Sequence, residues 1–258
     1  MNNPFERQDY SLYHYTNLNA LISILRSECI VLWATNAAYL NDPTELKQGI
    51  AIVNELENTN FQFDDFKNIY LTSFSRNSDS LVMWSQYGAH GNGCSIGLSS
   101  KAIGDTYGKF CKCSYGKDDT EKYLKNTLNL IDNGVTTAFG VPQPSEKSIS
   151  EQRNLARQIF LQTTCVMSKD LAYRHEDETR AFVEVPQELY QQVQFRLVDN
   201  RIVPYVQMQL DKEALTDLII GPTLNADITE RSIKQMLEIR GYDLSKINIR
   251  FSEVPFRG

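Results

Sequence analysis

Apolar residues recur along this chain at two spacings, one typical of strands and one typical of helices. Residues 11–16 alternate and are rich in aromatic side chains, which favours a strand. The following residues place apolar side chains at helical spacing, after a cap at Thr16 or Asn17. The same criteria predict further strands at 29–35, 68–75, 94–98, 109–115, 178–185, 193–198, 201–209, 218–220 and 247–252. They predict further helices at 44–57, 79–87, 119–132, 148–168 and 229–240.

The order of these elements predicts the fold class. Helices and strands are mixed without a sustained βαβ rhythm, which favours an α+β fold over a doubly wound parallel sheet. The strands 193–198 and 201–209 are expected to form a hairpin with its turn at Asp199-Asn200. We expect residues 1–258 to form a single α+β domain with a helical insertion near 117–168.

Composition places the chain among globular proteins. Hydrophobic residues make up 41% and charged residues 22% of the 258 positions, so a core can form without disulfides or a metal. The apolar runs are far shorter than the roughly 20 residues of a membrane helix, and residues 1–10 lack the pattern of a signal peptide. The five cysteines are scattered and odd in number, which is typical of reduced thiols. We therefore expect a cytoplasmic protein with no membrane contact.

Charge and motif spacing argue against two other classes of protein. The net charge of −6 provides no overall basic field for nucleic acid, although a local patch remains open. Cys111 and Cys113 are one residue apart and no second pair follows, so no structural zinc is predicted. The glycines at 91–97 precede a strand, which is the wrong context for a dinucleotide fingerprint.

His14 is the first candidate site residue, within Tyr13-His14-Tyr15-Thr16. On a strand its side chain shares a face with Leu12 and Thr16, and the two tyrosines point the other way. An imidazole near a strand end can serve as donor or acceptor at the mouth of a cleft. The alternative interpretation, which the tetrapeptide alone favours, is a core histidine bonded to a backbone carbonyl.

A run of charges, Arg174-His175-Glu176-Asp177-Glu178-Thr179-Arg180, leads into an apolar strand. Strand alternation predicts Glu176, Glu178 and Arg180 on one face. Two carboxylates so close repel each other, which raises the pKa of one unless an arginine compensates, and Arg174 or Arg180 is placed to do so. The alternative interpretation is a solvated, charged start to the strand.

The third candidate combines serines at a strand end with aromatic residues on the next helix. Ser73 and Ser75 precede a short helix on which Trp84 and Tyr87 lie three apart, in position to form a stacking wall. In the alternative interpretation Trp84 simply belongs to the core. The fourth candidate, Asn41-Asp42-Pro43-Thr44-Glu45, is by itself typical of a turn and a helix cap.

Taken together, these motifs resemble a bacterial family associated with abortive infection and phage defence. The family pattern runs from Tyr-His-Tyr-Thr through Asn-Asp-Pro, Ser-Phe-Ser, Asp-Ser and Met-Trp-x-x-Tyr to a lysine ahead of Glu-x-Glu-x-Arg. The matching residues are 13–16, 41–45, 73–75, 79–80, 83–87, 93–97, Lys169, Glu176, Glu178 and Arg180. They occur in the same order across residues 10–185, and their joint occurrence is more specific than any single motif.

That layout is in turn similar to the ADP-ribosyltransferase-like fold, which implies mixed sheets flanked by helices and NAD as substrate. The resemblance implies an NAD cleft lined by His14, Thr16, Ser73, Ser75, Trp84, Tyr87 and Arg180. His14 is then expected to contact the adenosine-side ribose, and Tyr87 or Trp84 to stack on nicotinamide. Glu178 is expected to hold the 2′-hydroxyl of the nicotinamide ribose, and Glu176 to orient the acceptor.

The chemistry that this resemblance implies is undemanding for a protein. Cleavage of the nicotinamide–ribose bond develops oxocarbenium character, which a fixed carboxylate in a water-poor cleft stabilises. The expected activity is ADP-ribosyl transfer to an unidentified protein or nucleic acid, or NAD hydrolysis, in antiviral defence or a toxin–antitoxin system with a partner protein. One alternative is a non-catalytic binding, sensor or antitoxin module on the same fold. Another is a metal-dependent nuclease that uses Asp42, Glu45, Glu176 and Glu178, whereas the NAD hypothesis predicts no metal.

Overall fold

The computed structural model describes residues 9–40, 44–133, 148–223 and 225–255. The strands are β1 (Ser11–Asn17), β2 (Ile30–Asn36), β3 (Ile69–Ser75), β4 (Gly93–Ser99), β5 (Lys109–Lys112), β6 (Ser114–Tyr115), β7 (Ser168–Lys169), β8 (Glu178–Glu184), β9 (Gln194–Val198), β10 (Arg201–Leu210), β11 (Leu215–Ile220) and β12 (Asn248–Phe251). The α-helices are α1 (Leu18–Ile24), α2 (Glu45–Glu57), α3 (Leu81–Gln86), α4 (Ser100–Tyr107), α5 (Gly116–Asp132), α6 (Ile149–Met167) and α7 (Ala226–Ile239). Helices combined with a mixed sheet confirm the predicted α+β class.

The chain forms two compact units, each assembled from separate stretches of sequence. Unit 1 takes in Met1–Thr35, Tyr70–Cys111 and His175–Gly258, and unit 2 takes in Asn36–Ile69 and Lys112–Arg174. The helical insertion expected near 117–168 corresponds to α5 and α6, and unit 2 also includes α2. The assignment of the whole chain to a single domain stays a prediction.

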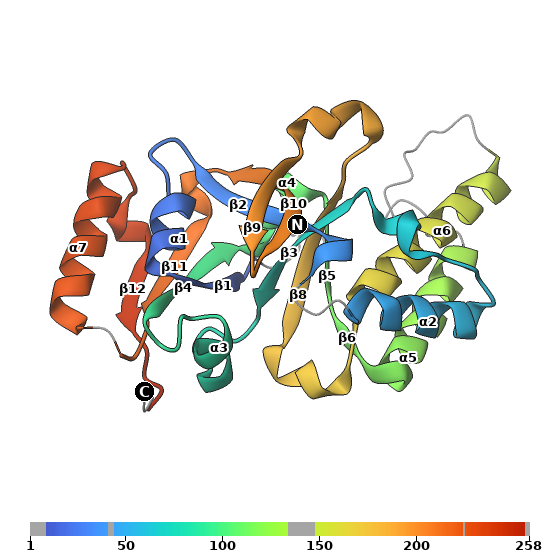
Figure 1. The fold of residues 1–258 in the computed structure, drawn as a ribbon, viewed down its shortest axis with the longest axis horizontal. Coiled ribbons are helices and arrows are strands. Elements are labelled where there is room, and N and C mark those ends of the chain that lie inside the picture. Colours follow the sequence, from blue (N-terminus) through green and yellow to red (C-terminus); the bar gives the residue numbers. More distant parts are fainter. Residues whose placement is uncertain (1–8, 41–43, 134–147, 224, 256–258) are drawn as a thin grey trace, which may run out of the picture. The chain divides into compact units, whose positions relative to one another are not determined.

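Unit 1 is built on a ten-stranded sheet in the order β12-β11-β4-β1-β3-β2-β10-β9, with β8 paired to both β3 and β5. β1 pairs antiparallel with β4 along its whole length, from Ser11–Ser99 to Asn17–Gly93. β11 pairs parallel with β12 and antiparallel with β4, so the sheet is mixed. Figure 1 shows α7 lying beside β11 and β12 at one end of this sheet.

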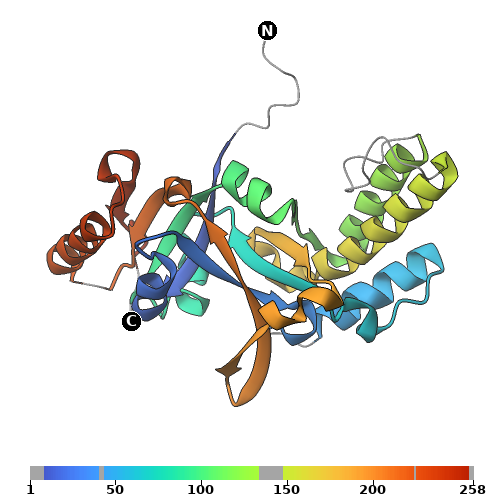
Figure 2. The same ribbon diagram turned by 90° about the horizontal axis from the view of Figure 1, so that it is seen from above.

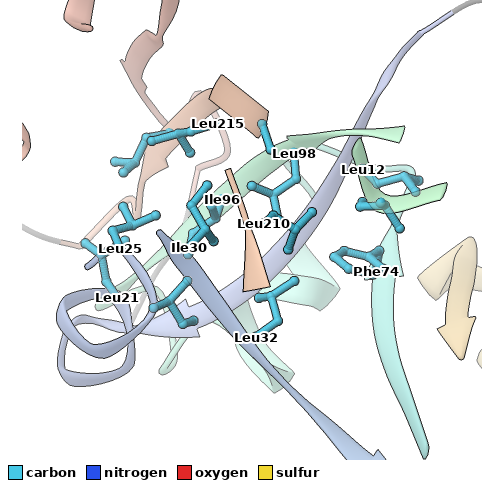
Figure 3. Packing of buried hydrophobic residues seen from close by; sticks show 14 of the residues in the cluster. Leu12, Leu21, Leu25, Ile30, Leu32, Phe74, Ile96, Leu98, Leu210 and Leu215 are labelled. Atoms are coloured by element: carbon cyan, nitrogen blue, oxygen red, sulfur yellow. The ribbon is translucent and has the colours of Figure 1, made fainter. Parts of the chain in front are cut away.

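The main core of unit 1 lies against one face of these strands. Alternate residues of β1 and β4 point into it, and α1 packs on it with its own apolar stripe. Figure 3 shows these side chains converging from strands and helix alike. Its labelled members are Leu12, Leu21, Leu25, Ile30, Leu32, Phe74, Ile96, Leu98, Leu210 and Leu215.

Local sequence signals place two of the boundaries. The Asn17 side chain accepts a hydrogen bond from the Ala20 backbone N–H at 2.8 Å, which confirms the cap expected before α1. Asp199 and Asn200 have φ values of 46° and 62°, the left-handed pair that a two-residue hairpin turn requires. β9 and β10 therefore form the predicted hairpin, with Val198 opposite Arg201.

Unit 2 is mainly helical, with α2, α5 and α6 packed side by side (Figure 2). α2 and α6 approach closely at Gly49, where an added Cβ would lie 1.9 Å from the Cys165 carbonyl oxygen. Glycine is needed there because any other residue forces the helix backbones apart. Arg157 of α6 also reaches across to Glu57 at the end of α2, with Nη2 2.6 Å from Oε2.

All five cysteines are free thiols. Cys94 on β4 in unit 1 and Cys165 on α6 in unit 2 have no exposed surface. Burial raises the pKa of the Cys94 thiol to about 12 and also raises the pKa of Cys165. Each unit therefore holds at least one protonated, inaccessible thiol in its interior, and unit 2 also buries Cys113.

Candidate functional site

The strands that carry the predicted site residues lie next to one another in unit 1. β1 carries His14, β3 carries Ser73 and Ser75, and β8 carries Glu178. β3 pairs with β1 at Tyr13–Ser75 and also pairs with β8. One strand therefore separates the histidine strand from the glutamate strand, although the two are remote in sequence.

Strand alternation decides which side of the sheet each side chain occupies. Leu12 of β1, Phe74 of β3 and Ala181 of β8 all belong to the main core of unit 1. Residues two apart share a face, so His14 lies on the core side of β1. Glu178 differs from Ala181 by an odd number of residues and lies on the opposite side of β8. The structure thus brings the strands together but directs the two side chains to different faces.

The start of β8 holds three charged side chains that are almost completely buried. Glu176, Glu178 and Arg180 are 2%, 4% and 3% exposed. Arg180 binds Glu178 in a bidentate arrangement, with Nε donating to Oε1 at 2.7 Å and Nη2 to Oε2 at 3.2 Å. The arginine that compensates the acidic pair is therefore Arg180. Arg174 pairs with Asp119 in unit 2, with Nη2 2.6 Å from Oδ2.

Glu176 reaches this cluster by a turn and not by strand alternation. β8 begins at Glu178, and Asp177 has φ 41°, a left-handed conformation that is uncommon for residues other than glycine. The expectation that Glu176 and Glu178 alternate along one strand is therefore wrong. The turn is held by backbone contacts to the end of β3: the Glu176 carbonyl accepts from Ser75 Oγ at 2.7 Å, and the Asp177 carbonyl accepts from the Arg76 N–H at 3.0 Å.

Tyr87 connects the end of α3 to the buried acid. Its hydroxyl donates to Glu176 Oε1 at 2.7 Å, while the side chain keeps 36% of its surface exposed. A tyrosine donor and a buried carboxylate thus meet where solvent or a ligand can reach the ring. Ser75 and Tyr87 therefore both bind Glu176, and the structure also joins Glu178 to Arg180 and His14 to Ser73 among the predicted site residues.

Trp84 belongs to a small core and does not form an exposed wall. It is fully buried, packs edge-on against Tyr15 with ring centroids 4.9 Å apart, and donates from Nε1 to Asp79 Oδ1 at 2.6 Å. The Asp79 carboxylate accepts the indole hydrogen bond. The residue at the N-cap position of α3 is Ser80. Trp84 thus anchors α3, the helix that Tyr87 follows, to the small core.

His14 is held by β3. Its Nδ1 lies 3.1 Å from the Ser73 carbonyl oxygen, and its ring meets Phe74 edge-on at 6.1 Å. A carbonyl can only accept, so Nδ1 carries the proton and Nε2 is left as the acceptor. Burial lowers the pKa of His14, and the charge of Arg196 lowers it further. The bond to a backbone carbonyl is the contact that the core-histidine interpretation expects, but His14 is only partly buried, whereas Thr16 on the same side of β1 is buried.

Unit 2 also contains a buried ion pair. It joins two residues of the family pattern described above, Lys169 and Glu45. Lys169 Nζ lies 3.2 Å from Glu45 Oε1, and the two side chains are only 3% and 10% exposed. The ammonium also lies 4.9 Å from the centre of the Tyr173 ring. No local pattern predicts this pairing, because the partners are far apart in sequence. Asn41, Asp42 and Pro43 lie outside the described residues.

Neither a metal-ligand cluster nor a membrane-spanning helix is present among the described residues. Within the part of the chain that is described, no three histidine, cysteine or acidic side chains gather as metal ligands. Over the same residues, no helix combines the length and apolar character needed to cross a membrane.

Comparison with known proteins adds one finding. A family model described as "Protein of unknown function (DUF2971)" matches residues 83–181, which is less than half of the chain. The matched segment begins after His14 and the serines of β3. It contains Trp84, Tyr87, Glu176, Glu178 and Arg180. No curated protein and no solved structure matched the chain. The Tyr87–Glu176 contact and the Glu178–Arg180 pair both lie inside the segment that is similar to this family.

Proposed function

We propose that this protein consumes NAD, as an ADP-ribosyltransferase or an NAD glycohydrolase, with its catalytic centre at the start of β8. The observation that carries the proposal is the buried pair of carboxylates, Glu176 and Glu178, beside an exposed tyrosine ring. Buried charges are costly, so their presence at one place favours a site over a structural role. β1, β3 and β8 are neighbours in the sheet, but His14 and Glu178 point to different faces of it, so the proposed centre consists of the β8 carboxylates and Tyr87.

Glu178 is the proposed catalytic carboxylate. Arg180 grips both of its oxygens, which fixes its position and offsets the cost of burying its charge. A carboxylate fixed in a water-poor site stabilises the positive charge that develops on the ribose as nicotinamide leaves. NAD's leaving group is already cationic, so no strong general acid is required.

Tyr87 and Glu176 are proposed to act on either side of that charge. The exposed Tyr87 ring offers a stacking surface for nicotinamide, and its hydroxyl fixes the Glu176 carboxylate that orients the acceptor. His14 lies on the other face of the sheet from Glu178, so it is proposed to act only as a positioning residue, through its hydrogen bond to the Ser73 carbonyl of β3. The acceptor is a macromolecule of a bacterial antiviral or toxin–antitoxin system.

Release of nicotinamide from NAD by the purified protein tests the proposal. Glu178→Gln is expected to lower turnover roughly 100-fold or more per folded molecule, the scale of losing one preorganised electrostatic contact. Binding of NAD should weaken much less, because the interaction matters mainly in the transition state. Glu184→Gln is the matched control, since Glu184 is an exposed carboxylate at the far end of β8.

The variant Tyr87→Phe distinguishes the proposed role of Glu176 from that of Glu178. It keeps the stacking ring but removes the donor to Glu176, so transfer to an acceptor should fall more than NAD hydrolysis. Turnover left intact by Glu178→Gln would sink the catalytic assignment.

A non-catalytic binding or antitoxin module on the same fold is the second candidate. The observation that favours it is that both Glu178 oxygens are already bound by Arg180. This candidate predicts no nicotinamide release from the parent protein, at any enzyme concentration, while binding of a ligand at Tyr87 is retained.

A further inference from the structure

A cluster of polar and aromatic side chains lies on the other side of the sheet from the main core, over β2, β10 and β9. Trp33 pairs with Gln207, Thr35 with Tyr205, and Tyr205 with Gln194, so these residues share one face. The neighbouring residues Leu32, Ala34 and Val206 point into the core instead. The members of this group, termed the Arg196 cluster, are Trp33, Thr35, Gln194, Arg196, Tyr205 and Gln207.

Arg196 stands at the centre of the cluster. Its Nη2 donates to Thr35 Oγ1 at 2.8 Å, and its guanidinium carbon lies 5.2 Å from the centre of the Trp33 ring and 5.7 Å from that of Tyr205. The two rings stack on each other at 4.4 Å. Gln194 accepts from the Tyr205 hydroxyl at 2.9 Å, so the cluster is ordered by its own contacts.

The charge of Arg196 is not balanced by an acid. Among the residues that the structure describes, no carboxylate pairs with it, and its buried Nε has no hydrogen-bond partner. Burial lowers its pKa, although a guanidinium stays charged at neutral pH. The stacked rings compensate only part of this cost, because they offer no acceptor to the N–H groups.

An accessible aromatic ring lies beside the Arg196 guanidinium. Trp33 is 37% exposed, which leaves aromatic surface open beside the guanidinium. A planar fork of donors next to an open aromatic ring is the combination that recognises a phosphate attached to a base.

We propose that the Arg196 cluster is a binding subsite for a phosphate-bearing nucleotide, with Arg196 on the phosphate and Trp33 against the base. None of the residues of this subsite belongs to the motifs at the start of β8, so the subsite does not rest on the proposed catalytic function.

The two tryptophans make the proposal directly measurable. Trp84 is fully buried and Trp33 is exposed, so a ligand in the Arg196 cluster changes the emission of Trp33 alone. The full chain is titrated with AMP, adenosine and inorganic phosphate at low salt, by fluorescence and by calorimetry. AMP is expected to bind at least about tenfold more tightly than either fragment, because only AMP uses both halves of the subsite.

Variants assign the binding to residues. Arg196→Gln should weaken AMP binding about tenfold or more, whereas Arg201→Gln, which changes an exposed arginine of the same hairpin, should leave it unchanged. Trp33→Phe should abolish the emission change, with binding still seen by calorimetry. Arg196→Lys serves if Arg196→Gln fails to fold, since it keeps the charge and loses the fork.

Three results would overturn the subsite. They are no calorimetric binding of AMP at millimolar concentration, equal weakening by Arg201→Gln, and AMP binding no tighter than adenosine or inorganic phosphate. Glu178→Gln should leave AMP binding unchanged. Failure of the subsite is thereby distinguishable from failure of the proposed catalytic centre.

Discussion

In the buried ion pair of Glu178 and Arg180, each charge depends on the other for compensation. Both are nearly inaccessible, and breaking a buried ion pair by removing one partner costs about 3–5 kcal/mol. The charge run alone favours a solvated strand start as readily as a buried one, and at a solvated position Glu178→Gln would be nearly neutral. Activity of that variant must therefore be compared per folded molecule.

His14 gives the protein a pH-dependent stability. Its pKa is lowered from the ordinary 6.5 because burial disfavours the imidazolium. The unfolded chain then binds more protons than the folded one below about pH 6.5, so stability is complete above that pH and falls as the pH falls through it. The expected slope is at most about 1.4 kcal/mol per pH unit for this one proton.

Urea unfolding at pH 5, 6, 7 and 8 measures this effect. His14→Asn places an amide nitrogen near the position of Nδ1 and removes the titration, so the slope should flatten. His90→Asn is the control, since His90 is exposed and has φ 52°, which asparagine tolerates. A flat wild-type profile would contradict the prediction.

At the scale of elements, the packing of α2 on α6 depends on one missing side chain. An added Cβ at Gly49 would collide with the Cys165 carbonyl, and a backbone oxygen cannot move aside as a side chain does. Gly49→Ala is therefore expected to destabilise the protein by about 1–3 kcal/mol or more, despite the higher helix propensity of alanine. Lys47→Ala, at an exposed position of the same helix, should change stability by less than about 0.5 kcal/mol. Thermal and urea unfolding of both variants decide the matter, and a more stable Gly49→Ala would refute the close approach.

The sequence predicts elements better than it predicts their partners. Period-two and helical spacing identify most strands and helices within a few residues, but α4 is missed because it is only eight residues long and buries just one apolar pair at helical spacing, Ile103 and Tyr107. The predicted strand 109–115 is in fact two short strands, β5 and β6. The pairing of β1 with β4 has no local signal, since register depends on side chains from distant segments.

The candidate site follows the same rule. The motif Glu-x-Glu-x-Arg identifies the residues of the buried cluster and a compensating arginine. The turn at Asp177 is invisible to alternation, because a left-handed aspartate is set by contacts to β3 and not by its neighbours in sequence. The contact of Tyr87 with Glu176 likewise depends on the fold alone.

At the scale of the whole molecule, the two units provide separate reporters of opening. Cys94 and Cys165 are buried in different units and react with alkylating reagents only when their own surroundings open. Labelling at increasing urea, followed by mass spectrometry, should give different urea slopes for the two thiols. The partly exposed Cys29 and Cys111 should react first and serve as internal controls. Identical slopes at Cys94 and Cys165 would mean that the units unfold together.

The interleaved segments of the two units also set an order of events during synthesis. The last stretch of unit 2 ends at Arg174, whereas the sheet of unit 1 needs β11 between β4 and β12 near the end of the chain. Every segment of unit 2 has therefore been synthesised before β11, the strand that pairs with β4, leaves the ribosome. The helical unit is expected to be complete first, and the sheet that bears both candidate sites closes only after β11 has been synthesised.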